Sequence, residues 1–279
     1  MRFWGQNDEV NTAYSIHQAY ALSSFPRKRE SIVCFFKFKL DSRFRGNGGV
    51  GLLRQFRKWL GLMAHLTFTL KITPNFKLNC SKLTPNNLAG LSIEQITKLT
   101  LGNSKNSPQV ADFFDINFEK INPNLKSGND TNHIIFKNRP KCNMAQLDFI
   151  GANMSSGKIT VCGDVGDRLG DKMRRGVILV EGDAGDYAAS RMVAGTIGIL
   201  GKTGAYTGFA MKRGTILLAQ TPKLHATIQD CGTHDLPFLS LLFKSFENPQ
   251  FAAVASTRAK CFAGDLSVNG NGEILVLQA

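Results

Sequence analysis

Cys231 and His234 are the residues whose types and spacing most directly suggest covalent chemistry. They lie three positions apart, between Asp230 and Asp235. A thiol, an imidazole and a carboxylate could supply a nucleophile, a base and an orienting group. The same spacing is equally that of a turn before a helix, in which the cysteine is a small buried apolar residue. We favour the turn and expect no catalytic residue on this chain.

Acidic residues recur at intervals of 19. The two series are Asp148, Asp167 and Asp186, and Asp164 and Asp183. If equal spacing stacks them ~4.8 Å apart, neighbouring carboxylates repel each other by roughly 1 kcal/mol in water. Hydrogen bonds from turn amides, or ion pairs with Arg168 and Lys172, would offset this repulsion. A bound cation is the alternative, and we expect no metal site.

Basic residues gather around one turn of the same repeating pattern. They are Lys172, Arg174, Arg175, Arg191, Lys212 and Arg213. Cations along one edge of a rigid surface suit a partner rich in carboxylates. A solvated basic face, or a contact with another subunit, would use the same residues.

A 19-residue repeat organises the middle of the chain. Its most regular positions are Met154, Met173, Met192 and Met211, and Gly157, Gly176, Gly195 and Gly214. Each unit also holds alternating apolar residues, such as Ile178 and Val180, as a short strand does. Because so short a strand cannot bury its apolar face alone, the units must stack, with equivalent residues in register. The methionines then fill the core, which is more common than a soft-metal site.

The constant repeat length predicts an all-β protein. We expect a right-handed parallel β-helix with a 19-residue repeat, flanked by small α/β caps. The repeats occupy residues 147–220, an N-terminal cap and variable region residues 63–146, and a C-terminal α/β cap residues 221–279. A left-handed hexapeptide helix would need apolar residues every six positions, which the sequence lacks. The glycines are expected at turns with positive φ, where other residues are strained.

The caps carry their own local signals. Ser92 with Gln95 predicts a capping box and a short helix, and Asp235 and Pro237 predict the start of a second helix. The Asn-Gly-Asn-Gly run at 269–272 predicts a hairpin that joins strands at 266–268 and 274–276. Alternating apolar residues from Leu66 to Ile72 predict a half-buried strand.

Residues 1–62 differ from the rest in composition. They hold 11 basic and 4 acidic residues, a net charge of +7. The block from Pro26 to Ser31 and the block from Asp41 to Gly46 are related as the two strands of one DNA segment are, because the reverse complement of the first, shifted by one base, encodes the second. We expect a spurious or disordered leader, with Met63 as the working start. A basic amphipathic arm that contacts a membrane or RNA is the alternative.

Composition narrows the function classes further. The whole chain has 34 basic and 21 acidic residues, a net charge of +13, but discounting the leader removes more than half of it. We therefore expect neither a nucleic-acid partner nor a membrane partner. Six cysteines without a Cys-x-x-Cys pair indicate reduced thiols in a cytoplasmic protein rather than a disulfide framework.

The repeat units resemble a known family. The segments that carry the likeness are Gly163–Gly166, Met173–Tyr187 and Met211–Leu217, with flanks at Leu66–Lys71, Leu88–Leu91, Asp230–Leu239 and Ala263–Leu266. They look like the glycine-rich repeat domain of the β-helix subunit of formylmethanofuran dehydrogenase, which is more distantly similar to the C-terminal β-helix of glutamate synthase. The likeness covers roughly residues 63–279.

The resemblance implies a role in one-carbon metabolism. It implies a non-catalytic scaffold subunit of a formyltransferase/hydrolase complex, which moves a formyl group from tetrahydromethanopterin through a methanofuran-type carrier and releases formate. This complex would take part in the conversion of formaldehyde to formate. The partners would be the other subunits, and no cofactor would be bound tightly. The six basic residues named above would contact an anionic carrier. A glutamate-synthase-type spacer and a free-standing ligand-binding β-helix are the alternatives.

The expected start can be tested directly. Terminal peptides from cells that express the gene should begin at Met63 or Ala64 when they are sequenced by mass spectrometry. Abundant peptides that span Trp4 to Arg43 would contradict a start at Met63.

Overall fold

The computed structural model describes residues 65–102, 107–119 and 132–278. The chain divides into two units, residues 1–45 and 46–279, and every described residue belongs to the second. The expected leader and the expected start at Met63 lie outside the described residues.

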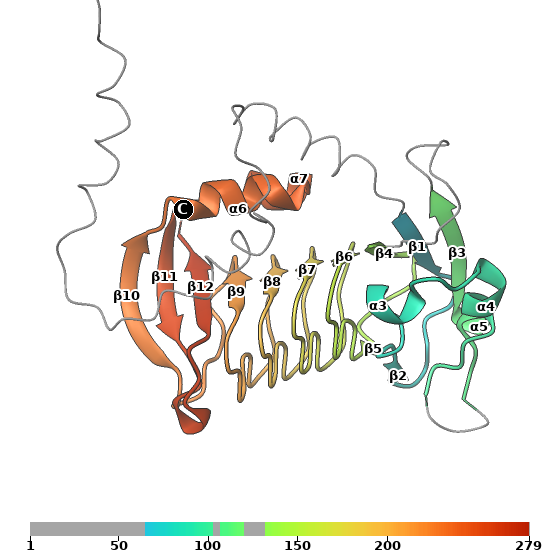
Figure 1. Ribbon diagram of the computed structural model, residues 1–279, viewed down its shortest axis with the longest axis horizontal. Coiled ribbons are helices and arrows are strands. Elements are labelled where there is room, and N and C mark those ends of the chain that lie inside the picture. Colours follow the sequence, from blue (N-terminus) through green and yellow to red (C-terminus); the bar gives the residue numbers. More distant parts are fainter. Residues whose placement is uncertain (1–64, 103–106, 120–131, 279) are drawn as a thin grey trace, which may run out of the picture. The chain divides into compact units, whose positions relative to one another are not determined.

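Ten strands form one mixed sheet (Figure 1). In sheet order they are β10 (Gln229–Asp235), β11 (Arg258–Ala263), β12 (Glu273–Leu277), β9 (Thr215–Leu218), β8 (Thr196–Ile199), β7 (Val177–Val180), β6 (Lys158–Val161), β4 (His133–Asn138), β1 (His65–Leu70) and β3 (Phe114–Glu119). The strands from β12 to β1 are all parallel, whereas β3, β11 and β10 pair antiparallel with their neighbours.

The other described elements are short. β2 (Leu78–Asn79) and β5 (Leu147–Asp148) form a second, parallel pair. The helices are α3 (Pro85–Leu88), α4 (Ile93–Thr97), α5 (Val110–Phe113), α6 (Phe238–Phe246) and α7 (Pro249–Ala253), with a 3-10 turn, η1 (Leu266–Val268). The fold is therefore mostly β with few short helices, as the sequence predicted.

The 19-residue stride places equivalent residues of successive units opposite one another. Ile159 pairs with Ile178, Ile178 with Ile197, and Ile197 with Ile216. Ile274 of β12 pairs with Ile216 in the same way, although β12 lies outside the repeat. A strand near the C-terminus of the chain thus continues the stack of repeat strands.

Backbone hydrogen bonds join the units outside the strands as well. At one turn the amide of Arg168 donates to the carbonyl of Asp186 at 2.8 Å, and at another the amide of Arg174 donates to the carbonyl of Met154 at 2.8 Å. Isolated parallel bridges connect the units at a third place. Each unit therefore follows the path of the unit before it over its whole length.

The repeat methionines form an internal column, as the sequence predicted. Met154, Met173, Met192 and Met211 are fully buried. A β-carbon added at Gly176 would lie 2.5 Å from the methyl carbon of Met154, and one added at Gly195 would lie 2.8 Å from that of Met173. Successive methionines therefore point in the same direction, each toward the glycine of the next unit.

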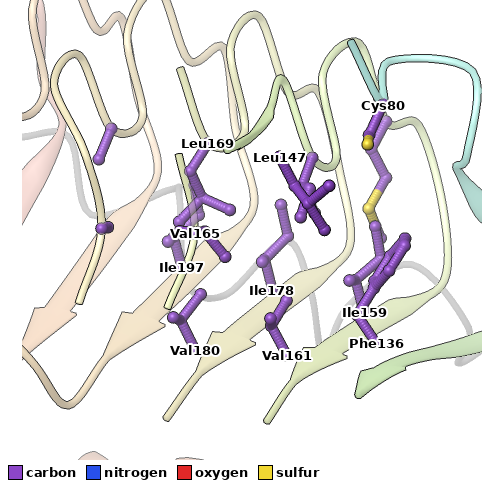
Figure 2. Close-up of a cluster of buried hydrophobic side chains, with 14 of the residues drawn as sticks. Cys80, Phe136, Leu147, Ile159, Val161, Val165, Leu169, Ile178, Val180 and Ile197 are labelled. Carbon is purple, nitrogen blue, oxygen red and sulfur yellow. The ribbon is translucent and has the colours of Figure 1, made fainter. Parts of the chain in front are cut away.

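Aliphatic side chains fill the rest of the interior (Figure 2). Ile159, Ile178 and Ile197 lie one beyond the other along the stack, and Val161 and Val180 repeat the arrangement beside them. All five are fully buried. Full burial of each such side chain contributes roughly 1.5–3 kcal/mol of gross hydrophobic stabilisation.

The glycines serve two different purposes, and only one was expected. Gly176 has a φ of +103°, as predicted for a turn. Gly185 does not have a positive φ, but its added β-carbon would lie 2.2 Å from the Oδ1 atom of Asp167. Gly185 ends the segment Gly182–Gly185, one of the Gly-Asp-x-Gly steps of the repeat. Glycine is needed in this step because an aspartate of the preceding unit approaches it. Conversely, Arg168 and Tyr187 adopt φ of 59°, so some left-handed turns use larger residues.

Helices α6 and α7 cover the outer face of the sheet (Figure 1). Leu239, Phe243 and Phe251 from the helices pack with Leu179 of β7 and Leu217 of β9 in a second apolar cluster. Gly198 of β8 makes room for the Phe251 ring, because a β-carbon there would lie 2.5 Å from it. The predicted second helix is thus confirmed, and it buries the side of the sheet that faces away from the repeat core.

The first predicted helix is also confirmed. Ser92 Oγ accepts the amide of Gln95 at 3.3 Å, and the Gln95 side chain accepts the amide of Ser92 at 2.8 Å. The predicted strand from Leu66 to Ile72 is observed as β1, which ends at Leu70.

Two local predictions were wrong. Residues 266–268 form η1 rather than a hairpin strand, because the side chain of Asp265 accepts the amide of Ser267 at 2.9 Å and starts a turn. β12 then pairs with β9 and β11 instead. Cys231 lies in the exposed edge strand β10 rather than in a turn with a buried thiol.

Replacing Gly176 by valine should destabilise the array strongly. The valine would combine a strained left-handed φ, about 1–2 kcal/mol, with a clash against Met154 and the Gly157 carbonyl, for which overpacking adds about 1–3 kcal/mol. Gly90→Val is the matched control, because Gly90 has a φ of +82° but nothing within 4 Å of its added β-carbon. Urea unfolding should show a larger loss for Gly176→Val, and equal losses would contradict the packing of this turn.

Candidate functional site

Cys231 and His234 do not form a nucleophile and base pair. The Nε2 atom of His234 donates to the carbonyl of Cys231 at 2.7 Å, and the Cys231 thiol points to the carbonyl of Gln229 at 3.7 Å. Asp230 accepts the amide of Gly232, which lowers its pKa, with a smaller effect from Lys260. The imidazole therefore supports the backbone of β10 rather than the thiol.

The aspartate series bind the backbone of the next unit. Asp148 Oδ1 accepts the amide of Asp167 at 2.8 Å, and Asp167 Oδ1 accepts the amide of Asp186 at 2.9 Å. The second series does the same, since Asp164 Oδ1 accepts the amide of Asp183 at 2.8 Å. The predicted bonds to turn amides are confirmed, and these carboxylates act as links between units.

The cation that balances the first series is Lys77, not Arg168 or Lys172. Lys77 Nζ lies 3.4 Å from Asp148 Oδ1 and 3.3 Å from Asp167 Oδ2. Burial raises the pKa of Asp148, and the amide of Asp167 and the charge of Lys77 oppose that rise. Lys77 precedes β2, so the contact depends on a long-range pairing that the repeat does not encode.

Arg168 belongs to a column of flat side chains that the repeat places one above another. Its guanidinium lies 4.9 Å from the centroid of the Tyr187 ring and 5.8 Å from that of Phe149. Tyr187 stacks on Tyr206 with centroids 5.0 Å apart and planes 11° apart. His225, another 19 residues on, lies 6.4 Å from Tyr206.

Three members of this column, Phe149, Tyr187 and Tyr206, stand 19 or 38 residues apart and were expected to stack, but they are too few to predict a ligand-binding aromatic ladder. The 19-residue spacing itself would have found Arg168 and His225. The stacked rings turn their faces toward one another rather than to solvent. The column therefore stabilises this turn of the stacked units more than it presents a surface for a ligand.

The six basic residues predicted to contact an anion lie at one corner of the stack, but they do not form a continuous row. Lys172, Arg174, Lys212 and Arg213 are exposed, as is Arg175. The unit between them places Val193 and Ala194 where its neighbours have cations. The cations therefore form two groups, about two strand spacings or ~10 Å apart.

Arg191 has a separate role within this corner. Its Nε and Nη2 atoms donate to Asp171 at 2.9 and 2.7 Å, and the Ser190 hydroxyl donates to the same carboxylate at 2.6 Å. Asp171 is buried, and a buried carboxylate needs such partners. Part of the charge of Arg191 is thus neutralised by Asp171, which was not predicted as its partner.

The last unit is closed by Asp265. In the units before it, the amides of Asn153, Lys172 and Arg191 each donate to a carbonyl of the next unit. The equivalent amide of Ala210 donates to Asp265 Oδ2 at 2.7 Å. A fully buried carboxylate therefore takes the place of the carbonyl that a further unit would supply.

A partly buried histidine, His133, lies on the outer face of the sheet beside Lys158. His133 Nε2 is 3.0 Å from the Thr160 hydroxyl. Burial lowers the pKa of His133 to about 3, and the charges of Lys158 and His65 contribute. The Lys158 ammonium donates to the carbonyl of Phe246 at the end of α6. Lys158 therefore attaches the helix to the sheet, and the lowered pKa of His133 keeps its imidazole neutral near pH 7.

Within residues 65–102, 107–119 and 132–278, no three His, Cys, Asp or Glu side chains are grouped so that they could hold a metal ion. In the same ranges, no helix has the length and apolar character that a membrane span requires.

Comparison with known proteins gives a loose likeness to a solved structure. No protein-family model matches the chain, and no curated protein matches it. Among solved structures, it is similar to a chain in the X-ray crystal structure of the formyltransferase/hydrolase complex (FhcABCD) from Methylorubrum extorquens in complex with methylofuran. The two are 25% identical over 76% of this chain and 100% of the other, with a TM-score of 0.42. Neither a family nor a particular subunit follows from a likeness at this level.

Replacing Asp265 by alanine should weaken the end of the stack. The buried amide of Ala210 would lose its acceptor, which costs about 1–3 kcal/mol. Asp230→Ala is the control, because Asp230 is an exposed carboxylate that also accepts an amide. Urea unfolding should show the larger loss for Asp265→Ala.

Unfolding measured at low pH should reveal the same hydrogen bond between Asp265 and the amide of Ala210. Burial alone would raise the pKa of Asp265, but hydrogen bonds from Ser267, the Ala210 amide and Thr227 lower it to about 2, from 3.8. The ionised carboxylate of Asp265 therefore makes its full contribution to the free energy of unfolding above pH 3.8. This contribution is lost as the pH falls toward 2. The wild-type chain should lose this part of its stability across that interval and Asp265→Ala should not. Parallel acid profiles would contradict this role.

Proposed function

We propose that the stacked units form a right-handed parallel β-helix with a 19-residue coil. Three observations support it: the in-register parallel strands, the interunit hydrogen bonds at the turns, and the shared direction of the methionines. We propose that residues 63–146 and 221–279 cap the two ends of this stack. In support, the antiparallel strand β3 lies at one edge of the sheet, and β11 and β10 lie at the other.

We further propose that this β-helix is a non-catalytic scaffold subunit of a cytoplasmic formyltransferase/hydrolase complex of the formylmethanofuran dehydrogenase type. The observation that supports the scaffold role is that side chains of reactive types form hydrogen bonds that hold the fold together. Asp167 and Asp183 bind turn amides, Asp171 binds Arg191, and His234 binds a carbonyl. Cys231 and His234, the pair that the sequence offered as nucleophile and base, each contact a backbone carbonyl rather than each other.

The assignment to one-carbon metabolism rests on the repeat residues. The resemblance to the β-helix subunit of formylmethanofuran dehydrogenase falls on the Met-x-x-Gly and Gly-Asp-x-Gly positions. In the fold, these positions are the methionine column and the aspartate links, so the motif marks the residues that determine the stack. The proposed process links tetrahydromethanopterin and a methanofuran-type carrier, with the chemistry on other subunits.

Reconstitution tests this role. The purified chain should bind the catalytic subunits of such a complex in a co-purification with defined components. By itself, it should release no formate from a formylated carrier. Failure to bind those subunits, or formate release by the chain alone that is lost in Cys231→Ala, would overturn the scaffold role.

The basic corner is the proposed contact for the anionic carrier. Its exposed cations, Lys172, Arg174, Arg175, Lys212 and Arg213, lie in two groups that a flexible polyanion could bridge, with Arg191 between them. Such contacts are electrostatic and should weaken as salt screens them.

A polyglutamate peptide is the probe for this corner. Arg174→Ala and Lys212→Ala should each weaken its binding about two- to fivefold at low salt, in the range of single exposed ion pairs. Lys244→Ala is the control, because Lys244 is an exposed lysine on α6. Fluorescence anisotropy would measure the affinities. Equal affinity in all variants would place carrier binding elsewhere or exclude it.

A further inference from the structure

Two cysteines lie opposite each other in the antiparallel pair β10 and β11. Asp230 pairs with Phe262 and Thr233 pairs with Lys260, with a bulge between them. Two residues of β10, Cys231 and Gly232, therefore share the position across from Cys261 of β11. Directly opposite residues of an antiparallel pair have α-carbons ~4.5–5.5 Å apart, within the range of about 4.4–6.8 Å that a disulfide needs.

Both thiols are on the same face of the sheet. Each points along its own strand to the carbonyl two residues earlier, Cys231 to Gln229 at 3.7 Å and Cys261 to Ala259 at 3.5 Å. Gln229 pairs with Ala263, which shares a face with Ala259 and Cys261 because side chains alternate along a strand. The two sulfur atoms are thus on one side, not on opposite sides, of the pair.

The two cysteines differ in access. Cys231 is exposed, whereas Cys261 is partly covered by the cluster under α6. Burial raises the pKa of the Cys261 thiol, the charges of Glu273 and Cys231 raise it further, and a hydrogen bond from the amide of His234 opposes them. An exposed thiol beside a more protected one is the arrangement of an attacking and a resolving cysteine.

We propose that Cys231 and Cys261 form a reversible disulfide, with a low-molecular-weight disulfide such as glutathione disulfide as the oxidant. The Cys231 thiolate attacks one sulfur of the oxidant, forms a mixed disulfide and releases one glutathione thiolate. The Cys261 thiolate then attacks the Cys231 sulfur and releases the second. The protein loses two electrons and two protons, and the oxidant is reduced to two thiols.

The disulfide would secure the edge of the sheet. The seven residues of β10 are all exposed, and within the ten-stranded sheet this edge strand has β11 as its single neighbour. The bond would join the two strands covalently and close the loop that holds α6 and α7. Oxidation would therefore restrain the edge and the helices that cover the outer face.

Oxidation of the full chain by glutathione disulfide tests the proposal. Peptide mapping without reduction should find Cys231 linked to Cys261, and dithiothreitol should release the link. Amide hydrogen exchange in residues 229–235 should slow several-fold on oxidation. Cys231→Ser and Cys261→Ser should each abolish that change, whereas Cys162→Ser, at a partly buried cysteine outside this strand pair, should keep it.

Three results would overturn the proposed disulfide between Cys231 and Cys261 or its proposed effect. Links from Cys231 to Cys34, Cys142 or Cys162 in place of Cys261 would show that another pair reacts. Stable glutathione on Cys231 in the wild-type chain, with no link to Cys261, would show that the second step does not occur. A linked pair without any change in exchange would refute the restraint of β10.

Discussion

The stacking of equal units at the strand spacing is the constraint on which the rest of the structure depends. Each unit satisfies its backbone groups with the unit beside it, at the turns as well as in the strands. Because every unit has the same length, each side chain meets its own equivalent in the neighbours. In such a chain, repeated apolar side chains stabilise the stack by burying one another. Repeated charged side chains repel one another and need neutralising partners.

The columns show how different side chains meet this requirement. Apolar columns, such as the isoleucines, bury surface without any polar partner. Aspartates are tolerated because each carboxylate accepts an amide of the next unit, so the repulsion within a series is offset by hydrogen bonds. At the end of the stack, where no further unit exists, Asp265 and β12 supply the missing acceptor and the missing strand.

Spacing alone predicted the features that repeat, and it failed for the features that do not. The strand positions, the methionine column and the aspartate bonds follow from residues 19 apart. Lys77, Asp265 and β12 come from outside the repeat, so no local pattern indicated that they complete it. The glycines of the Gly-Asp-x-Gly step were assigned a turn conformation, whereas contact with the preceding unit requires them. Arg168 was expected to pair with the aspartates, whereas its guanidinium lies over the Tyr187 ring.

The candidate sites were predicted less well than the fold, for a related reason. The basic residues were grouped by their place in the sequence unit, but Val193 interrupts the row and Arg191 binds a buried carboxylate. Cys231 and His234 were compared by sequence distance, whereas strand pairing brings Cys231 to Cys261 instead. Side-chain partners depend on which strands pair, and short spacings do not contain that information.

The most direct test of the stacking is to remove one complete unit. Deletion of Ser155–Met173, 19 residues, leaves Met154 followed by Arg174 and keeps every later residue in register with the unit before it. Deletion of residues 156–173, one residue fewer, shifts the register and sends apolar side chains to the wrong face. Urea unfolding should show a cooperative transition for the 19-residue deletion and its loss for the shorter one. Equal stability of the two variants would contradict the account.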